Sequence, residues 1–462
     1  MLQPSDSPPT AAAGRPRAPL RVLLALAWPI VISRSTQVVI GIADALMVAH
    51  LGAAELAATS TGAMNAFAIF ILPMGVVFVV ASFSSQLTGA RDPAGVRRYG
   101  WYGLAVAAGA EVVSLAAIPA VPAALALAPY EPAVRDLMAD YLAIRLLSAV
   151  AVVGTEALGN CYGGAGDTRP QMRASVAAMV MNVAGNWILI DGHLGAPALG
   201  VRGAAIASVL SSAIAFLGLL AFFVRDGRRA GGPGPLRAPE FLRLLRFGIP
   251  SGFNWFFEFL AFMFFVNIVV AGLGTAALAA FMSVLQVNSV AFMPAFALAS
   301  AGAILAGQAI GAGRKDDVPR LAALTFAVAG SWEVAAGVAY LAYPELILAP
   351  FARDAGAAAA FLDAGRRMLM VSAAWQIFDA AASTLAETLR AAGDTAFVLW
   401  ARIVIAWGIF APGSWLSVRT LGGGSGVTML WLVVYLALLA AVLLVRFRRG
   451  AWRRIQLVEL TG

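Results

Sequence analysis

The sequence predicts an all-α polytopic membrane protein with twelve transmembrane helices. We expect two six-helix lobes, related by a pseudo-two-fold axis along the membrane normal. Of the 462 residues, 61% are hydrophobic and 12% are charged, whereas soluble domains carry about 25% charged residues. Roughly twelve apolar stretches are long enough to cross a bilayer, and several polar motifs recur in the two halves of the chain.

The expected spans are apolar runs of about 20 residues or more, bounded by charged residues or turn formers. They cover residues 21–49, 55–84, 98–126, 134–162, 170–190, 200–224, 240–271, 275–307, 319–348, 360–390, 395–417 and 425–446. The chain is therefore divided into a tail, a lobe, a linker, a second lobe and a second tail. The disordered cytoplasmic tail covers residues 1–19 and the N-terminal lobe covers residues 20–224. A Gly-, Pro- and Arg-rich cytoplasmic linker follows at 225–239, then the C-terminal lobe at 240–447 and a basic cytoplasmic tail at 448–462.

The basic residues predict the orientation in the membrane. With the N-terminus in the cytoplasm, about 23 of the 32 Lys and Arg residues fall on the cytoplasmic side and about six on the other. The tails and the 225–239 linker carry many of them. We therefore expect a multi-pass protein of the bacterial inner membrane with both termini in the cytoplasm.

Matching motifs indicate an internal duplication. Residues 51–58 (LGAAELAA) reappear as residues 273–280 (LGTAALAA), and an offset of about 222 residues also joins other polar positions. These are Gln86 with Gln308, Glu111 with Glu333 and, at a slightly larger offset, the Ala-Gly-Asp-Thr runs that start at Ala165 and Ala392. Two halves of six spans each point the same way, which places the axis along the membrane normal.

Composition also excludes several classes of function. The low charged fraction excludes a nucleic-acid-binding protein, and the single Cys161 excludes an intramolecular disulfide. The two histidines, His50 and His193, form no cluster for a metal. No nucleophile or metal constellation is visible, so we predict no enzyme and no cofactor. The expected partner is the lipid bilayer, and the protein is expected to be a monomer.

The first half carries an acid within a span. An ionisable side chain inside a bilayer costs about 2.5–3.5 kcal/mol on insertion scales, so it is a functional candidate. Asp44 lies well inside the first span. Asn182 and Asn186 are spaced i, i+4 on the fifth span, so their amides face one way. The hypothesis is a cation-coupling site; the alternative is ordinary hydrogen bonding between helices.

The second half carries two deep acids in aromatic surroundings. Glu258 follows Asn254 in the run Asn-Trp-Phe-Phe-Glu, and Asp379 ends the run that begins at Trp375. A carboxylate in such a setting is suited to proton or cation exchange, and the aromatic rings suit a planar cation. For the aromatic residues 255–257 themselves, core packing is the preferred interpretation.

Other polar or helix-breaking residues within the spans are weaker candidates for a functional role. Pro29 and Pro250 stand at corresponding points and predict a helix break in each half; the alternative is that membrane helices tolerate proline. For the duplicated pair Glu111 and Glu333 a structural, hydrogen-bonding role is preferred. Arg34 is expected to pair with an acid of its lobe or to reach an aqueous cavity.

Two further pairs of charges are read as structural. Arg145 with Asp140 and Arg390 with Glu387 are predicted to be partly interfacial pairs or snorkelling cations. We assign no chemistry to them.

The ordered motifs resemble one known family. A series of residues in and after the first span resembles the signature of the multidrug and toxic compound extrusion (MATE) transporters. Later segments resemble the NorM-like branch of that family. The first-span residues are Pro29, Gln37, Asp44, Leu51-Gly52 and Leu56-Ala57-Ala58, and the later segments are 197–205, 256–258, 376–379 and 389–395. The resemblance covers nearly all of residues 20–447. A departure is Phe281-Met282, where many members carry His-Gln.

The resemblance implies two six-helix lobes forming a V around a central cavity, and export of amphipathic, often cationic compounds against Na⁺ or H⁺. By resemblance, Asp44, Asn182 and Asn186 match the amino-lobe cation site, with Asn160 and Ser208 as further members. Glu258 and Asp379 match the carboxyl-lobe acids. The expected function is therefore antiport by alternating access. A lipid-linked saccharide flippase of the same superfamily is the alternative, and an ion channel is less favoured because the halves are duplicated.

Overall fold

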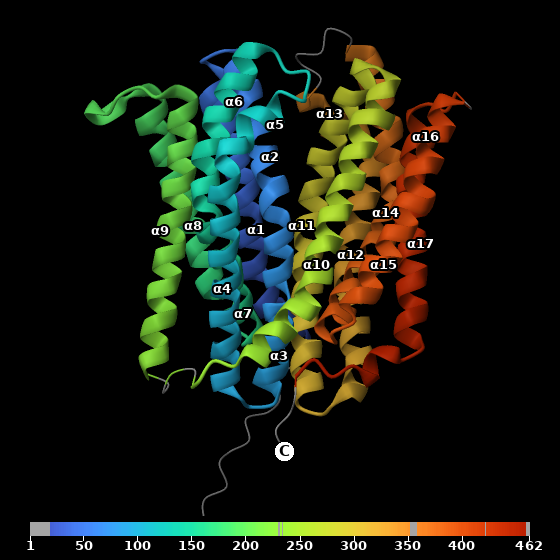
Figure 1. Ribbon diagram of the computed structural model, residues 1–462. Helices are drawn as coiled ribbons and strands as arrows, with labels where there is room; N and C mark the ends of the chain where they lie inside the picture. Colours follow the sequence, from blue (N-terminus) through green and yellow to red (C-terminus); the bar gives the residue numbers. More distant parts are fainter. Residues whose placement is uncertain (1–18, 230–231, 233, 352–357, 421, 459–462) are drawn as a thin grey trace, which may run out of the picture.

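The computed structural model describes residues 19–229, 232, 234–351, 358–420 and 422–458 (Figure 1). Every regular element in these ranges is a helix. Twelve of the helical segments are long and apolar enough to cross a membrane. The predicted fold class is thereby confirmed.

Within the described residues, the first half contains nine α-helices that form six spans. They are α1 (Pro19–Ala49), α2 (Ala53–Phe78), α3 (Val80–Gly89), α4 (Pro93–Ala117), α5 (Val121–Leu125), α6 (Pro132–Arg145), α7 (Ala149–Gly164), α8 (Arg169–Asp191) and α9 (Gly200–Arg229). The second half contains the other eight. They are α10 (Ala238–Phe264), α11 (Thr275–Gly311), α12 (Val318–Ala342), α13 (Pro344–Leu348), α14 (Ala358–Ala391), α15 (Thr395–Ile405), α16 (Ala411–Arg419) and α17 (Ser425–Arg448).

The spans lie close to the predicted ones, with one clear difference. The ninth was expected to reach residue 348, but α12 ends at Ala342 and Pro344 begins the short helix α13. Proline favours the first turn of a helix because it has no amide hydrogen to donate there. The predicted linker is also partly helical, since α9 continues to Arg229 and α10 begins at Ala238.

Most of the predicted tail at residues 1–19 lies outside the described residues. The basic segment after α17 packs onto both halves, because Trp452 joins a buried cluster of the C-terminal lobe and Leu457 joins the large cluster of the N-terminal half. Trp452 and Leu457 are buried, and Arg453 donates to the carboxylate of Asp316 at 2.6 Å. The Nζ atom of Lys315 donates to the backbone oxygen of Arg453. These contacts fix the segment against the loop between α11 and α12.

The two halves form separate groups of helices that meet along the centre of the molecule (Figure 1). Most members of each of the two largest buried clusters come from one half, and Leu244 of α10 joins the cluster of the N-terminal half. A smaller one joins Leu23 and Leu26 of α1 to Leu298 and Ile304 of α11. The helices α9 and α10 end and begin at the same end of the molecule, which we call the linker end (Figure 1).

Reciprocal contacts close the linker end between the two halves. Gln86 Nε2 donates to the backbone oxygen of Ala391 at 2.7 Å, and Gln308 Nε2 donates to that of Gly164 at 3.2 Å. A Cβ on Gly89 would overlap the Gln308 carbonyl oxygen, and a Cβ on Gly311 would overlap that of Gln86. Glutamines and glycines that match in the duplicated sequence therefore make matching contacts. This arrangement agrees with a two-fold relation between the halves.

The expected helix breaks at two prolines are wrong. The helix α1 runs through Pro29, and α10 runs through Pro250. Membrane helices tolerate proline because neighbouring groups and small local adjustments satisfy the freed carbonyl oxygen. Irregular helical turns occur elsewhere, as π-helical segments at Phe265–Val270 and Ala406–Phe410.

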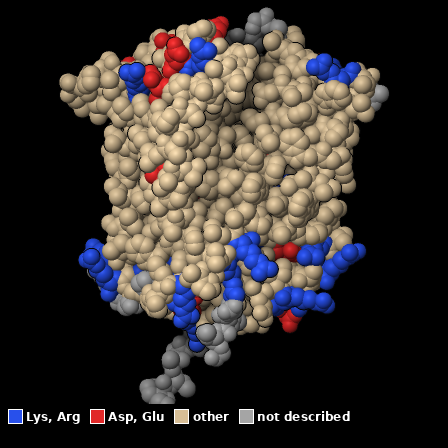
Figure 2. All heavy atoms as spheres, in the orientation of Figure 1, with Lys and Arg blue, Asp and Glu red and all other residues tan. Residues whose placement is uncertain are grey.

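Charged side chains occupy the two ends of the molecule. On the face in Figure 2, Lys and Arg side chains form a belt at the linker end, and basic and acidic side chains mix at the opposite end. A broad zone between the two ends is almost free of charge on this face. This distribution matches a protein whose middle zone faces hydrocarbon.

Candidate functional site

The first candidate site is a hydrogen-bonded network in the N-terminal lobe. Asn186 Nδ2 on α8 donates to Asp44 Oδ1 on α1 at 2.5 Å and to Asn182 Oδ1 at 3.3 Å. Asn182 Nδ2 donates to Ser208 Oγ on α9 at 3.2 Å. Both asparagines and the serine are buried. The i, i+4 spacing therefore does bring both amides to the acid of the first span, and Ser208 joins them.

The network retains free acceptor capacity. Asn186 Oδ1 is buried without a hydrogen-bond partner, and a carboxylate oxygen accepts more than one hydrogen bond. The cationic side chain that lies near Asp44 is Arg145 on α6. The predicted pair of Arg145 with Asp140 is wrong, because Asp140 accepts from Arg202 at 2.8 and 2.9 Å. The arginine points into the lobe instead and donates to Ser148.

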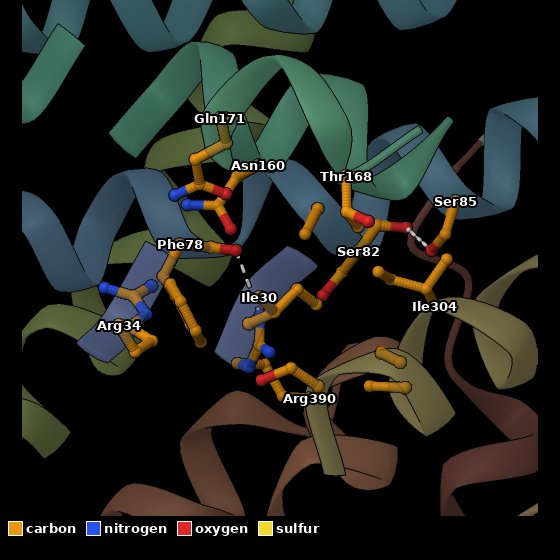
Figure 3. Close-up of a pocket in the computed structure, with 16 residues that line it drawn as sticks. Ile30, Arg34, Phe78, Ser82, Ser85, Asn160, Thr168, Gln171, Ile304 and Arg390 are labelled. Carbon is orange, nitrogen blue, oxygen red and sulfur yellow. Dashed lines mark hydrogen bonds between the residues drawn. The ribbon is translucent and has the colours of Figure 1, made fainter. Parts of the chain in front are cut away.

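Asn160 lies outside this network, in a small polar cavity between the halves (Figure 3). The cavity has a volume of about 30 Å³, enough for a water molecule or two. Asn160 Nδ2 has no hydrogen-bond partner there. Gln171 of the same lobe and Arg390 of the other half also line the cavity.

Arg34 on α1 reaches the same cavity and pairs with an acid of its lobe. Its two terminal nitrogens donate to the two carboxylate oxygens of Glu156 at 3.0 and 3.1 Å. This bidentate pair agrees with the expectation for Arg34. The acid itself was not singled out in the sequence, because it lies on another span, 122 positions away.

The second candidate site is a larger cavity in the C-terminal lobe, with a volume of about 640 Å³. That volume is typical of a site for a drug-sized molecule. Helices α10, α11, α14, α15 and α17 line it, together with Phe67 and Ile71 of α2. All four residues predicted for this lobe face it, namely Asn254, Glu258, Trp375 and Asp379.

The wall of this cavity is largely apolar and aromatic. Its rings belong to Phe67, Trp255, Phe259, Phe262, Phe292, Phe296 and Trp375. Trp255 packs edge-on against Phe78 and Phe296, with ring centroids 5.4 and 5.9 Å apart. Trp255 thus lines the cavity while it also packs, whereas Phe256 and Phe257 do not line it. A surface of this kind suits a flat amphipathic molecule.

Two ion pairs balance most of the charge in the cavity. Glu258 pairs with Arg402 of α15, and Glu387 pairs with Arg390 within α14. The prediction that Arg390 and Glu387 form an interfacial or snorkelling pair is wrong, because both are buried and line the cavity. The arginine also donates to the backbone oxygen of Phe78 at 3.0 Å and lies over the Phe78 ring.

Asp379 is the remaining acid of the cavity. Among the described residues, it forms no ion pair with a Lys, Arg or His side chain within 4.0 Å. Glu258 and Arg402 lie close enough to influence it electrostatically. The cavity therefore contains two balanced pairs and one acid without a cation of its own.

The duplicated glutamates have different surroundings. Glu111 accepts a hydrogen bond of 2.7 Å from the backbone nitrogen of Val150, at the start of α7. This contact agrees with the structural role preferred for the pair. Glu333 is fully buried on α12, and neither of its carboxyl oxygens has a hydrogen-bond partner. The carboxyl group of Asp379 lies beside it.

The fold and the two sites define a polytopic membrane protein with polar groups buried in each lobe and a drug-sized cavity. The sequence model of the MatE family matches residues 29–188 and 250–416. This protein therefore belongs to the MatE family of membrane transporters.

Curated relatives match along almost the whole chain. The probable multidrug resistance protein NorM of Agrobacterium fabrum is 26% identical over 92% of this chain and 93% of its own. The probable multidrug resistance protein NorM of Caulobacter vibrioides is 29% identical to this chain, and the match covers 95% of this chain and 94% of the relative. A solved structure, described as the outward-facing conformation of a multidrug resistance MATE family transporter of the MOP superfamily, is similar with a TM-score of 0.83. It is 20% identical to this chain, with 95% of this chain and 97% of that one covered.

Proposed function

We propose that this protein is a secondary active antiporter that exports amphipathic, cationic drugs or metabolites in exchange for H⁺ or Na⁺ by alternating access. The multidrug resistance names of its relatives support the substrate class. The observation that carries the proposal is the C-lobe cavity, because it combines an aromatic wall with an acid that lacks its own cation. Such a wall and such a charge together attract a flat organic cation.

The same observation argues against the flippase alternative. A carrier of a lipid-linked pyrophosphate needs cationic side chains that are free to bind phosphate. Both arginines of this cavity, Arg390 and Arg402, are already paired with glutamates. The cavity thus favours a cation over a pyrophosphate.

A transport assay with the purified protein in liposomes tests the proposal. Ethidium, a planar aromatic cation, is the probe, and an imposed pH or Na⁺ gradient is the driving force. We expect ethidium to move against its gradient when either ion flows the opposite way, and to stop when the ion gradient is collapsed by an ionophore. Movement that is unaffected by both gradients would contradict antiport.

We also propose that the linker end faces the cytoplasm, because the basic residues gather there (Figure 2). The native thiol of Cys161 is buried, so Cys161→Ala provides the background. In intact cells, a membrane-impermeant thiol reagent should label Asp136→Cys, at the opposite end, and should leave Leu236→Cys unlabelled until the cells are opened. Both side chains are exposed. The reverse pattern would invert the orientation.

A further inference from the structure

Glu333 is the most deeply buried acid of the described residues and has no place in the sites above. It is 0% exposed, and no backbone or side-chain donor makes a well-formed hydrogen bond to either carboxyl oxygen. An ionised carboxylate in that position would lose its hydration without replacement, at a cost of several kcal/mol. The neutral acid avoids this cost, so burial favours the protonated form of Glu333.

The protonated form of Glu333 has a partner within reach. The Asp379 carboxyl on α14 lies beside it, and α12 packs along α14. A carboxylic acid donates one hydrogen bond, and a carboxylate accepts it. A proton on Glu333 therefore satisfies both acids, and two adjacent carboxylates in low dielectric do not both ionise readily. The pair then holds one proton and one negative charge.

Asp379 connects this buried proton to the cavity. It lines the C-lobe cavity, whereas Glu333 does not. The other ionisable groups around the pair are Tyr340 on α12, Glu258 on α10, Arg402 on α15 and Tyr435 on α17. The helix α11, which also packs against α12, carries no ionisable side chain. Because Arg402 already pairs with Glu258, a proton or a cation in the cavity must neutralise the charge of the Glu333 and Asp379 pair.

We propose that Glu333 is the proton store of the C-terminal lobe and that Asp379 exchanges its proton with the cavity. This inference rests on the proposed antiport and makes H⁺ the coupling ion of this lobe. In the exchange, the O–H bond of Glu333 breaks as an O–H bond forms on Asp379, and Asp379 then passes the proton to cavity water. A cation arriving beside Asp379 favours that release, because it compensates the second negative charge.

The duplicated sequence provides a matched control. Glu111 occupies the equivalent place in the other lobe, but it accepts a backbone hydrogen bond, which a glutamine oxygen also accepts. We therefore compare Glu333→Gln with Glu111→Gln. Each substitution keeps the shape of the side chain and removes the ionisable group. Glu333→Gln should fold normally, because it replaces a neutral acid by a neutral amide.

The first measurement is infrared spectroscopy of the purified protein without substrate. We expect wild type to show the C=O stretch of a protonated, buried carboxylic acid, and Glu333→Gln to lose that band while Glu111→Gln keeps it. Identical spectra for wild type and Glu333→Gln would overturn the proposal. This measurement does not depend on transport, so its outcome is separate from that of the proposed function.

The second measurement is ethidium export driven by a pH gradient. We expect at least a tenfold loss of rate in Glu333→Gln and a rate within twofold of wild type in Glu111→Gln. Glu333→Asp keeps an acid and should retain part of the export; a loss as complete as that of Glu333→Gln would assign Glu333 to packing. Undiminished export by Glu333→Gln would also overturn the inference. Failure of wild type to export ethidium would instead contradict the proposed function.

Discussion

Asp44→Asn is expected to abolish gradient-driven export, to the background level of empty liposomes, without loss of the folded protein. The asparagine keeps the size of the side chain and an oxygen that accepts the hydrogen bond from Asn186. It cannot take up a proton, and it carries no charge to hold a sodium ion. The measurement is ethidium flux under an imposed pH or Na⁺ gradient, with thermal unfolding of the detergent-solubilised protein beside it.

A second acid of the same lobe serves as control for Asp44. Asp140 pairs with Arg202 at the surface, where both side chains are largely exposed. Asp140→Asn removes the same charge but should leave export within about twofold of wild type, since exposed ion pairs contribute about 0–1 kcal/mol. If Asp44→Asn exports as well as Asp140→Asn, the N-lobe network is structural, and coupling lies in the C-terminal lobe alone.

Glu258→Gln is expected to destabilise the protein. The Arg402 side chain is 12% exposed and is held beside Glu258, and its Nε atom already lacks a partner. The Glu258 side chain is 44% exposed in the cavity, so the loss of its charge leaves Arg402 only partly uncompensated. The cost should be about 1–3 kcal/mol, less than for a fully buried pair. The double variant Glu258→Gln with Arg402→Met removes both charges. It should recover most of that stability in a thermal or denaturant unfolding measurement.

The double variant also separates stability from transport. If the Glu258 charge takes part in cation exchange, the double variant should fold and yet export ethidium at less than a tenth of the wild-type rate. Recovery of both folding and export would show that the pair only balances charge. The exposed pair of Arg367 with Asp363 provides the control: Asp363→Asn should cost no more than about 1 kcal/mol.

Hydrophobic runs were enough to predict the spans, because each span must satisfy its own backbone inside hydrocarbon. The i, i+4 spacing of Asn182 and Asn186 was enough to place them together, since helix geometry is local. The partner of each buried arginine was harder to predict. Arg34 and Arg402 pair with acids on other helices, and a sequence pattern does not show which helix faces which.

The prolines and the duplicated glutamates show a second limit. Pro29 and Pro250 were expected to break their helices, but neighbouring helices decide whether a freed carbonyl oxygen is tolerated. Glu111 and Glu333 occupy equivalent positions, yet one accepts a backbone hydrogen bond and the other accepts none. Duplication preserved the residue while its surroundings diverged, so sequence equivalence alone did not predict equal roles.

The contacts that close the linker end set the scale of energy needed to open it. Across the two halves, the two glutamines and Arg390 make three hydrogen bonds to backbone oxygens. Such bonds contribute about 0.5–1.5 kcal/mol each, or up to about 3 kcal/mol when charged. One elementary charge moved through 100 mV supplies about 2.3 kcal/mol. A resting membrane potential acting on one or two ions is therefore comparable with the combined strength of these three bonds, as the proposed alternating access requires.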